Sequence, residues 1–406
     1  MLSGSLREAA RRASTNIAND LRGYKADGIG ASLGRGAAGI AVFSSYFARS
    51  VGNSDPNTLA LLRRCYEACD QLAMDASLFG GLTGLGWAVE YLNARDLMPD
   101  DIFSTSHLDS VLTELLAADD FRIGFDLVSG LVGWGVYALS RLHRSSGRLL
   151  CERIVCRLAG RAVWSELGAA WFSHPGSLGP VLNRRAPLGG FNLGIAHGVP
   201  GVVAFLAKAL ARGVSSSVAE PLLRGALAWT LAQGRHSNDG WHFGSLASPS
   251  EAESQSTRRV AWCYGDLGVS SALLLATRSI ANPEAHADVL RLAYTAAFRP
   301  CHTVTILDAG LCHGAAGAGH IFNRLYHTYG SEAFLEASRR WFQHALELCR
   351  PGTGFGGFSS RRLGAGGAME WIADPGLLTG AAGVGLAFEA ACSSIEPSWD
   401  AILLQH

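Results

Sequence analysis

Charged residues are scarce in this chain of 406 residues. Lys, Arg, Asp and Glu make up 17% of it, against about 25% in ordinary soluble domains. Its 34 basic residues equal its 34 acidic ones, so the formal net charge is zero. Such a chain lacks the excess of basic residues that attracts nucleic acid or an anionic membrane through bulk charge. We therefore expect no nucleic-acid partner.

The chain also lacks a convincing signal peptide or membrane span. Residues 1–21 alternate charged and apolar positions, as in an amphipathic helix, and contain no apolar core of signal-peptide length. The most apolar stretch, 376–395, is rich in Gly and Ala and includes Glu389, which favours a buried helix. Nine Cys, an odd number, without a secretory marker indicate a reducing compartment where thiols bind metal or fill the core. We expect a cytoplasmic protein without a membrane span or disulfides.

Glycine, in contrast, is abundant, with 49 residues against an average of about 7%. Much of it falls into seven spaced Gly-x-x-Gly motifs, each followed by an apolar run of helical length. The shortest interval between motifs, 45 residues (81 − 36), holds two ordinary helices and their connections. The motifs predict seven structural repeats, which begin at Gly36, Gly81, Gly130, Gly198, Gly265, Gly314 and Gly380.

A second series of helices is expected between these apolar runs. Its members have apolar residues three or four positions apart, such as Leu59 and Leu62, with charged residues such as Arg63 on the other side. The series comprises residues 6–21, 57–74, 107–118, 148–167, 218–233, 284–297 and 332–349.

Helices that are apolar all round must be buried, and helices with one polar face must lie outside. The alternation predicts an all-α fold, a seven-fold α/α toroid of seven inner and seven outer helices, as one domain over residues 1–406. Gly before each inner helix would permit a tight turn. Short extended pieces, such as residues 303–307, are expected only in loops. The irregular segments 174–193 and 235–259 are predicted rim loops that contact substrate.

Three consecutive repeats carry metal-ligand residues just before their first Gly. These residues are His197 in repeat four, Cys263 in repeat five, and Cys312 with His313 in repeat six. If all inner helices run the same way, these loops meet at one end of the barrel. Two thiolates and an imidazole suit zinc, and three protein ligands would leave a fourth position open. The spacing alone does not decide which of the four candidates is not a ligand.

Two further polar residues, Asp126 and Arg259, have two interpretations each. Asp126, four residues before Gly130, is either a helix cap or an acid at the same end of the barrel. Arg259 is either a solvated loop charge or an anion-holding group at the rim. Cys301-His302 repeats the Cys-His pair without a following Gly-x-x-Gly, so we interpret this pair as structural.

Taken together, these motifs resemble those of the lanthionine synthetase C-like family, the lanthipeptide cyclases. The resemblance spans essentially the whole chain. It implies the α/α toroid, a zinc ion held by Cys263, Cys312 and His313, acid/base roles for His197 and Asp126, and Arg259 in the pocket. The matching segments are Arg-Val-Ala-Trp-Cys-Tyr-Gly at 259–265, Cys-His-Gly at 312–314, Asn-Leu-Gly-Ile-Ala-His-Gly at 192–198, Asp126 with Ser129-Gly130, and Leu-Leu-Thr-Gly-Ala-Ala-Gly at 377–383.

The resemblance implies a zinc-dependent cyclase of lanthipeptide biosynthesis. Such an enzyme adds Cys thiols of a dehydrated precursor peptide to dehydroalanine or dehydrobutyrine and so forms (methyl)lanthionine thioether rings. The expected toroid occupies nearly all of the chain, so we expect a stand-alone cyclase that receives its peptide from a separate dehydratase. An export transporter, and peripheral association with a membrane-bound biosynthesis complex, are further expectations of the resemblance.

Three other functions remain open on the sequence. A related enzyme could use the same residues to add glutathione to dehydrated protein residues. A non-catalytic peptide-binding scaffold could keep the toroid, although the complete ligand set argues against it. An α/α-barrel glycosidase would need a second carboxylate beside Asp126, and few acidic residues fall at the motif end of the repeats.

Overall fold

The computed structural model describes residues 2–24, 30–53, 56–69, 74–95, 105–118, 122–237, 240–247, 259–303, 306–364 and 367–405. They form two compact units. Unit 1 comprises Met1–Thr105 and Pro300–Asp400, and unit 2 comprises Ser106–Arg299 and Ala401–His406.

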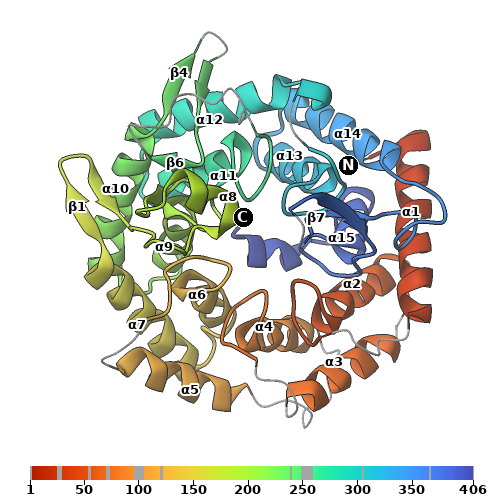
Figure 1. Cartoon of the computed structure of the whole chain (residues 1–406), viewed down its shortest axis with the longest axis horizontal. Helices are drawn as coiled ribbons and strands as arrows, with labels where there is room; N and C mark the ends of the chain where they lie inside the picture. Colours follow the sequence, from red (N-terminus) through yellow and green to blue (C-terminus); the bar gives the residue numbers. More distant parts are fainter. Residues whose placement is uncertain are drawn as a thin grey trace. The chain divides into compact units, whose positions relative to one another are not determined.

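In unit 1, helices that are almost fully buried pack on amphipathic helices. The buried helices are α2 (Ala37–Ser50), α4 (Leu82–Asn93), α13 (Ala315–Tyr329) and α15 (Ala381–Cys392). The amphipathic ones are α1 (Gly4–Gly23), α3 (Pro56–Cys69) and α14 (Glu332–Glu347). Helix α13 packs on α14 and α15, and α2 packs on α3 and α15. Figure 1 shows α2 beside α3 and α13 beside α14. The unit also contains the short helix η1 (Cys301–Thr303) and the hairpin of β7 (Ser360–Leu363) and β8 (Met369–Ile372).

Unit 2 repeats this arrangement. Its buried helices are α6 (Leu131–Ser140), α9 (Val199–Ala211) and α11 (Asp266–Ser279). Its amphipathic helices are α5 (Ser106–Ala117), α7 (Ser145–Arg161), α10 (Ser216–Ala232) and α12 (Pro283–Phe298). Helix α9 packs on α10 and α11, and α6 packs on α7. The short helix η2 (Ser398–Leu403) begins in unit 1 and ends in unit 2.

All fourteen helices predicted from the sequence are present, because each has the 3.6-residue apolar period that buries one face or all faces. Where the structure describes them, their ends differ by a few residues, and residues 70–73 of the run 57–74 lie outside the described residues. The largest difference is in the run 148–167, whose helix ends at Arg161 because Val163–Ser165 (β1) pairs with Gly168–Ala170 (β2). The extended piece expected at 303–307 is not a strand where the structure describes it, since Thr303 ends η1. Residues 304–305 lie outside the described residues.

Before six of the seven buried helices, glycine is needed for a reason other than the expected tight turn, whereas Gly265 has the positive φ that a tight turn requires. Six of the seven first glycines, all except Gly265, have extended backbone with negative φ. The seven residues that end on each first glycine, which we call the pre-helix loop, fold back on the start of the helix. In the second repeat, for example, the Leu82 N–H donates to the Asp75 carbonyl at 2.8 Å. A Cβ on Gly81 would overlap that carbonyl oxygen. Close backbone approach therefore excludes other residues here.

No helix within the described ranges combines the length and the apolar character that crossing a membrane requires.

Candidate metal centre

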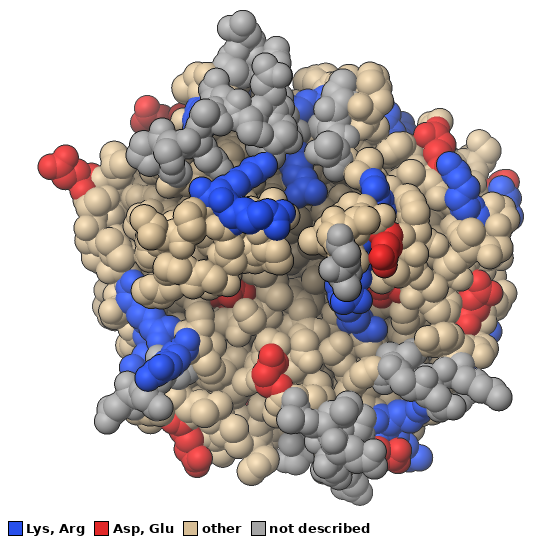
Figure 2. Space-filling model, in the orientation of Figure 1, with Lys and Arg blue, Asp and Glu red and all other residues tan. Residues whose placement is uncertain are grey.

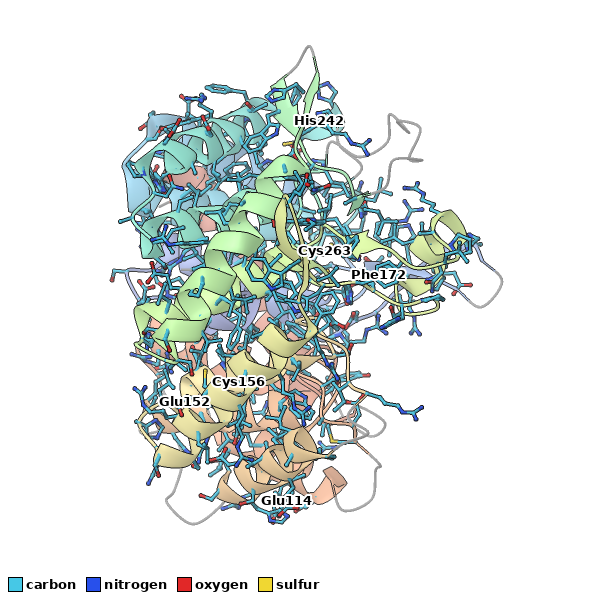
Figure 3. The ribbon with its side chains drawn as sticks, turned by 90° about the vertical axis from the view of Figure 1, so that its left-hand side faces the viewer. Glu114, Glu152, Cys156, Phe172, His242 and Cys263 are labelled. Carbon is cyan, nitrogen blue, oxygen red and sulfur yellow. The ribbon has the colours of Figure 1, made fainter. Side chains whose placement is uncertain are left out.

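The pre-helix loop of residues 259–265 holds Cys263 just before α11. The preceding Trp262 is 1% exposed, and its Nε1 donates to the Leu403 carbonyl at 2.9 Å. Cys263 itself is 6% exposed. Figure 3 shows Cys263 and Phe172 toward the same end of unit 2, away from Glu152 on α7. A buried tryptophan anchored by a hydrogen bond thus fixes the backbone that carries the Cys263 thiol.

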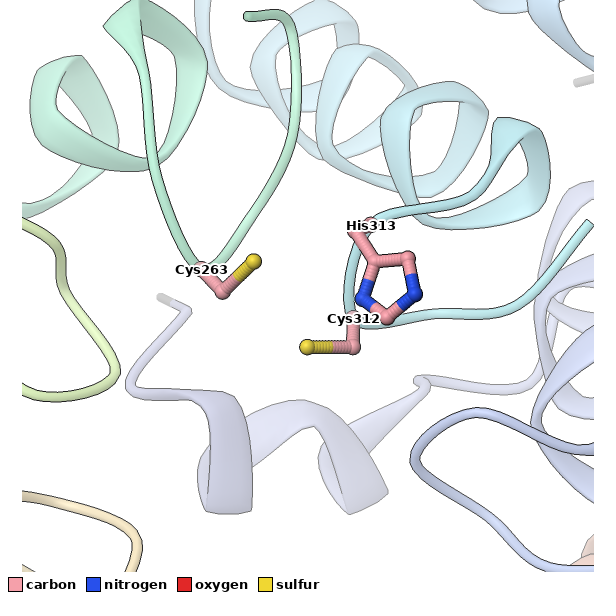
Figure 4. A group of neighbouring side chains, drawn as sticks. All are labelled: Cys263, Cys312 and His313. Atoms are coloured by element: carbon pink, nitrogen blue, oxygen red, sulfur yellow. The ribbon is translucent and has the colours of Figure 1, made fainter. Parts of the chain in front are cut away.

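In the part of the chain that the structure describes, one group of side chains has the spacing of a metal site. It consists of Cys263, Cys312 and His313, with one ligand atom of each within 4.8 Å of the other two (Figure 4). A tetrahedral zinc ion with Zn–S bonds of about 2.3 Å holds its ligand atoms roughly 3.8 Å apart. The group is therefore close to the required spacing, and two thiols with one imidazole are donors that zinc prefers.

His313 also faces a buried carboxylate. Its Nε2 lies 3.7 Å from Oδ2 of Asp308, which is 2% exposed. Asp308 is the first residue of the pre-helix loop that carries Cys312 and His313. Its Oδ1 accepts from the Gly310 N–H at 3.1 Å, and its Oδ2 accepts from the Arg361 N–H at 3.1 Å.

His197, the fourth candidate ligand, is not a member of the metal group. Its Nδ1 lies 3.6 Å from Oδ1 of Asp126 instead. The same Oδ1 accepts from the N–H groups of Val128 and Ser129, each at 2.8 Å. Burial acts to raise the pKa of the Asp126 carboxyl, but His197 and the donors of Ser129 outweigh it and hold this pKa below its usual value. Asp126 is thus a carboxylate at neutral pH.

Tyr264 connects the Cys263 loop to His197. Its ring stacks on the His197 ring, with centroids 6.4 Å apart, and its hydroxyl accepts from Asn192 Nδ2 at 2.9 Å. Asn192 in turn braces its own pre-helix loop, because its Oδ1 accepts from the Gly194 N–H at 2.8 Å. A chain of contacts thus runs from Asn192 through Tyr264 to the His197 ring.

Arg259 is the first residue of the Cys263 loop. Its carbonyl accepts from the Asp266 N–H at 3.1 Å, and the residue is half-buried. The role of its guanidinium in the pocket stays a prediction. Cys301 and His302 lie in η1, which packs on α14.

The two irregular segments are joined by a short sheet. Strand β3 (Phe191–Asn192) pairs with β6 (Leu246–Ala247), and β4 (Arg235–Ser237) pairs with β5 (Gly240–His242). Residues 248–258 of the second segment lie outside the described residues. The first segment contains helix α8 (Gly179–Arg185), where Leu178 and Leu182 pack with Leu246 and Tyr264.

Figure 2 shows basic side chains at the position of α8, and the last turn of this helix carries Arg184 and Arg185. Close by in the sequence, Leu188 is 83% exposed. The segment that packs on Tyr264 through Leu178 and Leu182 thus also carries two basic residues and an exposed leucine. The role of these segments as substrate-binding rim loops stays a prediction.

Asp308, Asn192, Tyr264 and Asp266 were missed as site residues on the sequence. Asp266 is fully buried beside Arg299, and its Oδ1 accepts from the Phe243 N–H at 2.7 Å, so it ties the Cys263 loop to the segment after β5. A signal for two of them exists in the sequence. Once the motifs are aligned, the position six residues before the first Gly is Asp or Asn in four of seven repeats, namely Asp75, Asn192, Asp308 and Asp374.

Comparison with solved structures shows a likeness to nisin cyclase. The TM-score is 0.72 at 19% sequence identity, over 97% of this chain and 96% of that chain. At this low identity the likeness supports the fold alone. It confirms the expected all-α fold class, the α/α toroid. A search of curated proteins found no match.

A family model gives the more specific result. The model described as lanthionine synthetase C-like protein matches residues 29–404, which is nearly the entire chain and includes all seven Gly-x-x-Gly motifs. This chain, with its Cys-Tyr-Gly and Cys-His-Gly loops, is therefore a member of the lanthionine synthetase C-like family.

Proposed function

We propose that the protein is a zinc-dependent lanthipeptide cyclase. It would add Cys thiols of a dehydrated precursor peptide across dehydroalanine or dehydrobutyrine, closing thioether rings. The observation that carries this proposal is the grouping of Cys263, Cys312 and His313 within metal-ligand distance. Membership of the family and the fold shared with nisin cyclase support it.

Cys263, Cys312 and His313 are the residues that would hold zinc. A bound zinc ion supplies a Lewis acid that keeps a coordinated thiol deprotonated at neutral pH, whereas a free Cys has a pKa near 8.5. As thiolates, Cys263 and Cys312 would offset the formal charge of the ion. A substrate thiolate would then be polarised less than at a site of three His residues and would keep more of its nucleophilicity.

His197 and Asp126 are suited to supply the proton that the addition requires. When the sulfur bonds to the β-carbon, the electrons of the C=C double bond move toward the α-carbon. The α-carbon must then gain a proton. We assign this donation to His197. Since Nδ1 of His197 faces the ionised Asp126, Nε2 is the nitrogen left for the substrate. Asp126 orients the ring and accepts from it, and does not act as the acid at neutral pH.

The remaining assignments follow from the same proposal. Arg259 would hold anionic groups of the substrate, and segments 174–193 and 235–259 would contact the peptide. The protein would act in the cytoplasm on a precursor dehydrated by a separate enzyme, next to an export transporter. Binding of isotope-labelled precursor, mapped by cross-linking, tests whether these segments make the contact.

Removal of the thiols tests the metal site. Cys263→Ala and Cys312→Ala should each lose stoichiometric zinc and abolish ring closure, measured by elemental analysis and by mass spectrometry after thiol trapping. Cys301→Ala is the matched control, because Cys301 also precedes a His but lies in η1. It should keep full zinc and activity. Full zinc and unchanged cyclisation in the Cys263 and Cys312 variants would overturn the proposal.

The same donor set could serve addition of glutathione to dehydrated residues. Incubation of the wild-type protein with a dehydrated peptide and glutathione separates the two reactions by mass. Rings without added mass support the cyclase, whereas glutathione adducts that depend on Cys312 assign the intermolecular reaction. If neither product forms, the function that remains is that of a non-catalytic peptide-binding scaffold.

A further inference from the structure

His313 presents two ring nitrogens to two different partners. Figure 4 shows the nitrogen next to the ring's attachment point, Nδ1, on the side of the two sulfur atoms. The other nitrogen, Nε2, lies 3.7 Å from Oδ2 of Asp308. We propose that Asp308 is a positioning residue that holds the His313 ring so that Nδ1 binds the metal. This inference rests on the zinc site proposed above.

Asp308 is itself held rigidly. It is 2% exposed, and its two carboxylate oxygens accept from the N–H groups of Gly310 and of Arg361 in β7, each at 3.1 Å. Its carbonyl accepts from the Ala315 N–H at 3.0 Å, which closes the loop that carries Cys312 and His313. A carboxylate with a locked position can impose an orientation on a half-exposed imidazole.

The last repeat shows what this position does without a metal ligand. Asp374 is equivalent to Asp308 in the repeat, is 4% exposed, and accepts from the Gly376 N–H at 2.8 Å. Its Oδ2 accepts at 2.6 Å from the hydroxyl of Thr379, which stands immediately before the first Gly, as His313 does. Both repeats therefore have a contact between the first and sixth residues of the loop. In repeat six the carboxylate of the first residue, Asp308, faces the imidazole of the sixth, His313.

A carboxylate at the far nitrogen of a ligand His has a known physical effect. It accepts the N–H, fixes the tautomer and raises the basicity of the nitrogen that binds the metal. Loss of such a partner typically costs 10- to 100-fold in metal affinity. Asp308→Asn keeps an amide oxygen for the Gly310 N–H but removes the negative charge that faces Nε2.

Zinc affinity measured by competition with a chromogenic chelator tests the inference. We expect Asp308→Asn to bind zinc 10- to 100-fold more weakly than wild type, and the matched Asp374→Asn to stay within about 3-fold of it. The unfolding midpoints of the two metal-free variants should fall by similar amounts, because both changes weaken a loop cap. If Asp308→Asn does not fold, Asp308→Ser, which keeps a capping oxygen without charge, takes its place with the same expectation.

The outcomes separate this inference from the proposed function. Equal zinc affinity in the Asp308 and Asp374 variants, with wild type binding one zinc that Cys312→Ala loses, would overturn the role of Asp308 and leave the site in place. A wild-type protein that holds no zinc, or a Cys312→Ala variant that holds as much as wild type, would overturn the site itself and this inference with it.

Discussion

Oδ1 of Asp126 accepts two backbone N–H groups of its own loop and also lies 3.6 Å from Nδ1 of His197. The sequence allowed either a helix cap or a functional acid here, and the structure shows that one carboxylate makes both sets of contacts. Its position also departs from the repeat. The other capping Asp and Asn residues stand six residues before the first Gly, whereas Asp126 stands four before it.

Asp126→Asn separates the two roles, because the amide oxygen can still cap the loop while the charge is lost. We expect ring formation to slow by about 100-fold, at the low end of the range for acid–base catalysis, with zinc content unchanged. The control is Asp75→Asn, which changes a loop cap that accepts from the Ser77 N–H at 2.9 Å.

His197→Ala should likewise keep zinc but lose correct ring formation. Zinc loss in His197→Ala would instead make His197 a ligand.

The lowered pKa of Asp126 also predicts a pH effect on stability. Its pKa in the folded protein lies below the ordinary 3.8. A depressed carboxyl pKa contributes stability that is fully present above the unfolded value and is lost as pH falls through the folded value. The stability difference between wild type and Asp126→Asn, measured by urea unfolding, should therefore be constant above about pH 5 and shrink below about pH 4. A difference that grows on acidification would contradict the assignment.

At the scale of elements, the pre-helix loop is the feature that every repeat shares. In six of the seven repeats the N–H after the first Gly donates to the carbonyl six residues before that Gly, at 2.8–3.1 Å. This closure leaves no space for a side chain on the first Gly. The closed loop also places the residues just before that Gly at the N-terminal end of a buried helix. These residues include Cys263, Cys312 and His313.

Gly81→Ala tests this packing away from the metal ligands. Its Cβ would meet the Asp75 carbonyl, which is backbone and cannot move as a side chain can. We expect a loss of about 3 kcal/mol in the free energy of unfolding, measured with denaturant. Gly160→Ala is the matched control, since Gly160 lies exposed within α7 with open space around it. It should stabilise by about 0.5–1 kcal/mol. Similar effects at both sites would refute the steric explanation.

At the scale of the molecule, buried ion pairs hold helices together within each unit. In unit 2, Oδ2 of Asp109 on α5 lies 2.7 Å from Nη2 of Arg141, just after α6, and both side chains are under 5% exposed. Oδ1 of Asp109 accepts from the Tyr137 hydroxyl at 2.7 Å, and Oδ2 accepts from the Ser146 hydroxyl at 2.6 Å. One carboxylate thus joins α5, α6 and α7.

Asp109→Ala should destabilise the protein by about 3–5 kcal/mol, because it removes the carboxylate that faces the buried Arg141 charge. Glu220→Ala removes the exposed ion pair between Glu220 and Arg224, which are 44% and 51% exposed, and should cost less than about 1 kcal/mol. Chemical denaturation measures both. A small loss for Asp109→Ala would show that Arg141 finds water or another acceptor.

Much of the fold could be read from the sequence, since helical periodicity and glycine spacing are local properties. The buried and amphipathic series followed from the 3.6-residue pattern, and so did the register of the pre-helix loops. The two-stranded sheets, four in the part of the chain that the structure describes, did not follow from the sequence. Their strands have two to four residues, too short to show an alternating pattern, and their pairing depends on which loops meet after the helices pack.

The candidate metal site, like the fold, was predictable from the sequence only in part. Sequence by itself placed His197, Cys263, Cys312 and His313 at equivalent loop positions, because the register is set by the glycines of each repeat. The spacing of the motifs did not decide which of the four are ligands, and the family resemblance implied Cys263, Cys312 and His313. The tertiary structure supplies the distances, which group these three and set His197 beside Asp126. It alone distinguished Asp308, which faces a ligand imidazole, from the equivalent Asp374, which faces a threonine. Distances between side chains depend on how whole helices pack, and no local pattern carries that information.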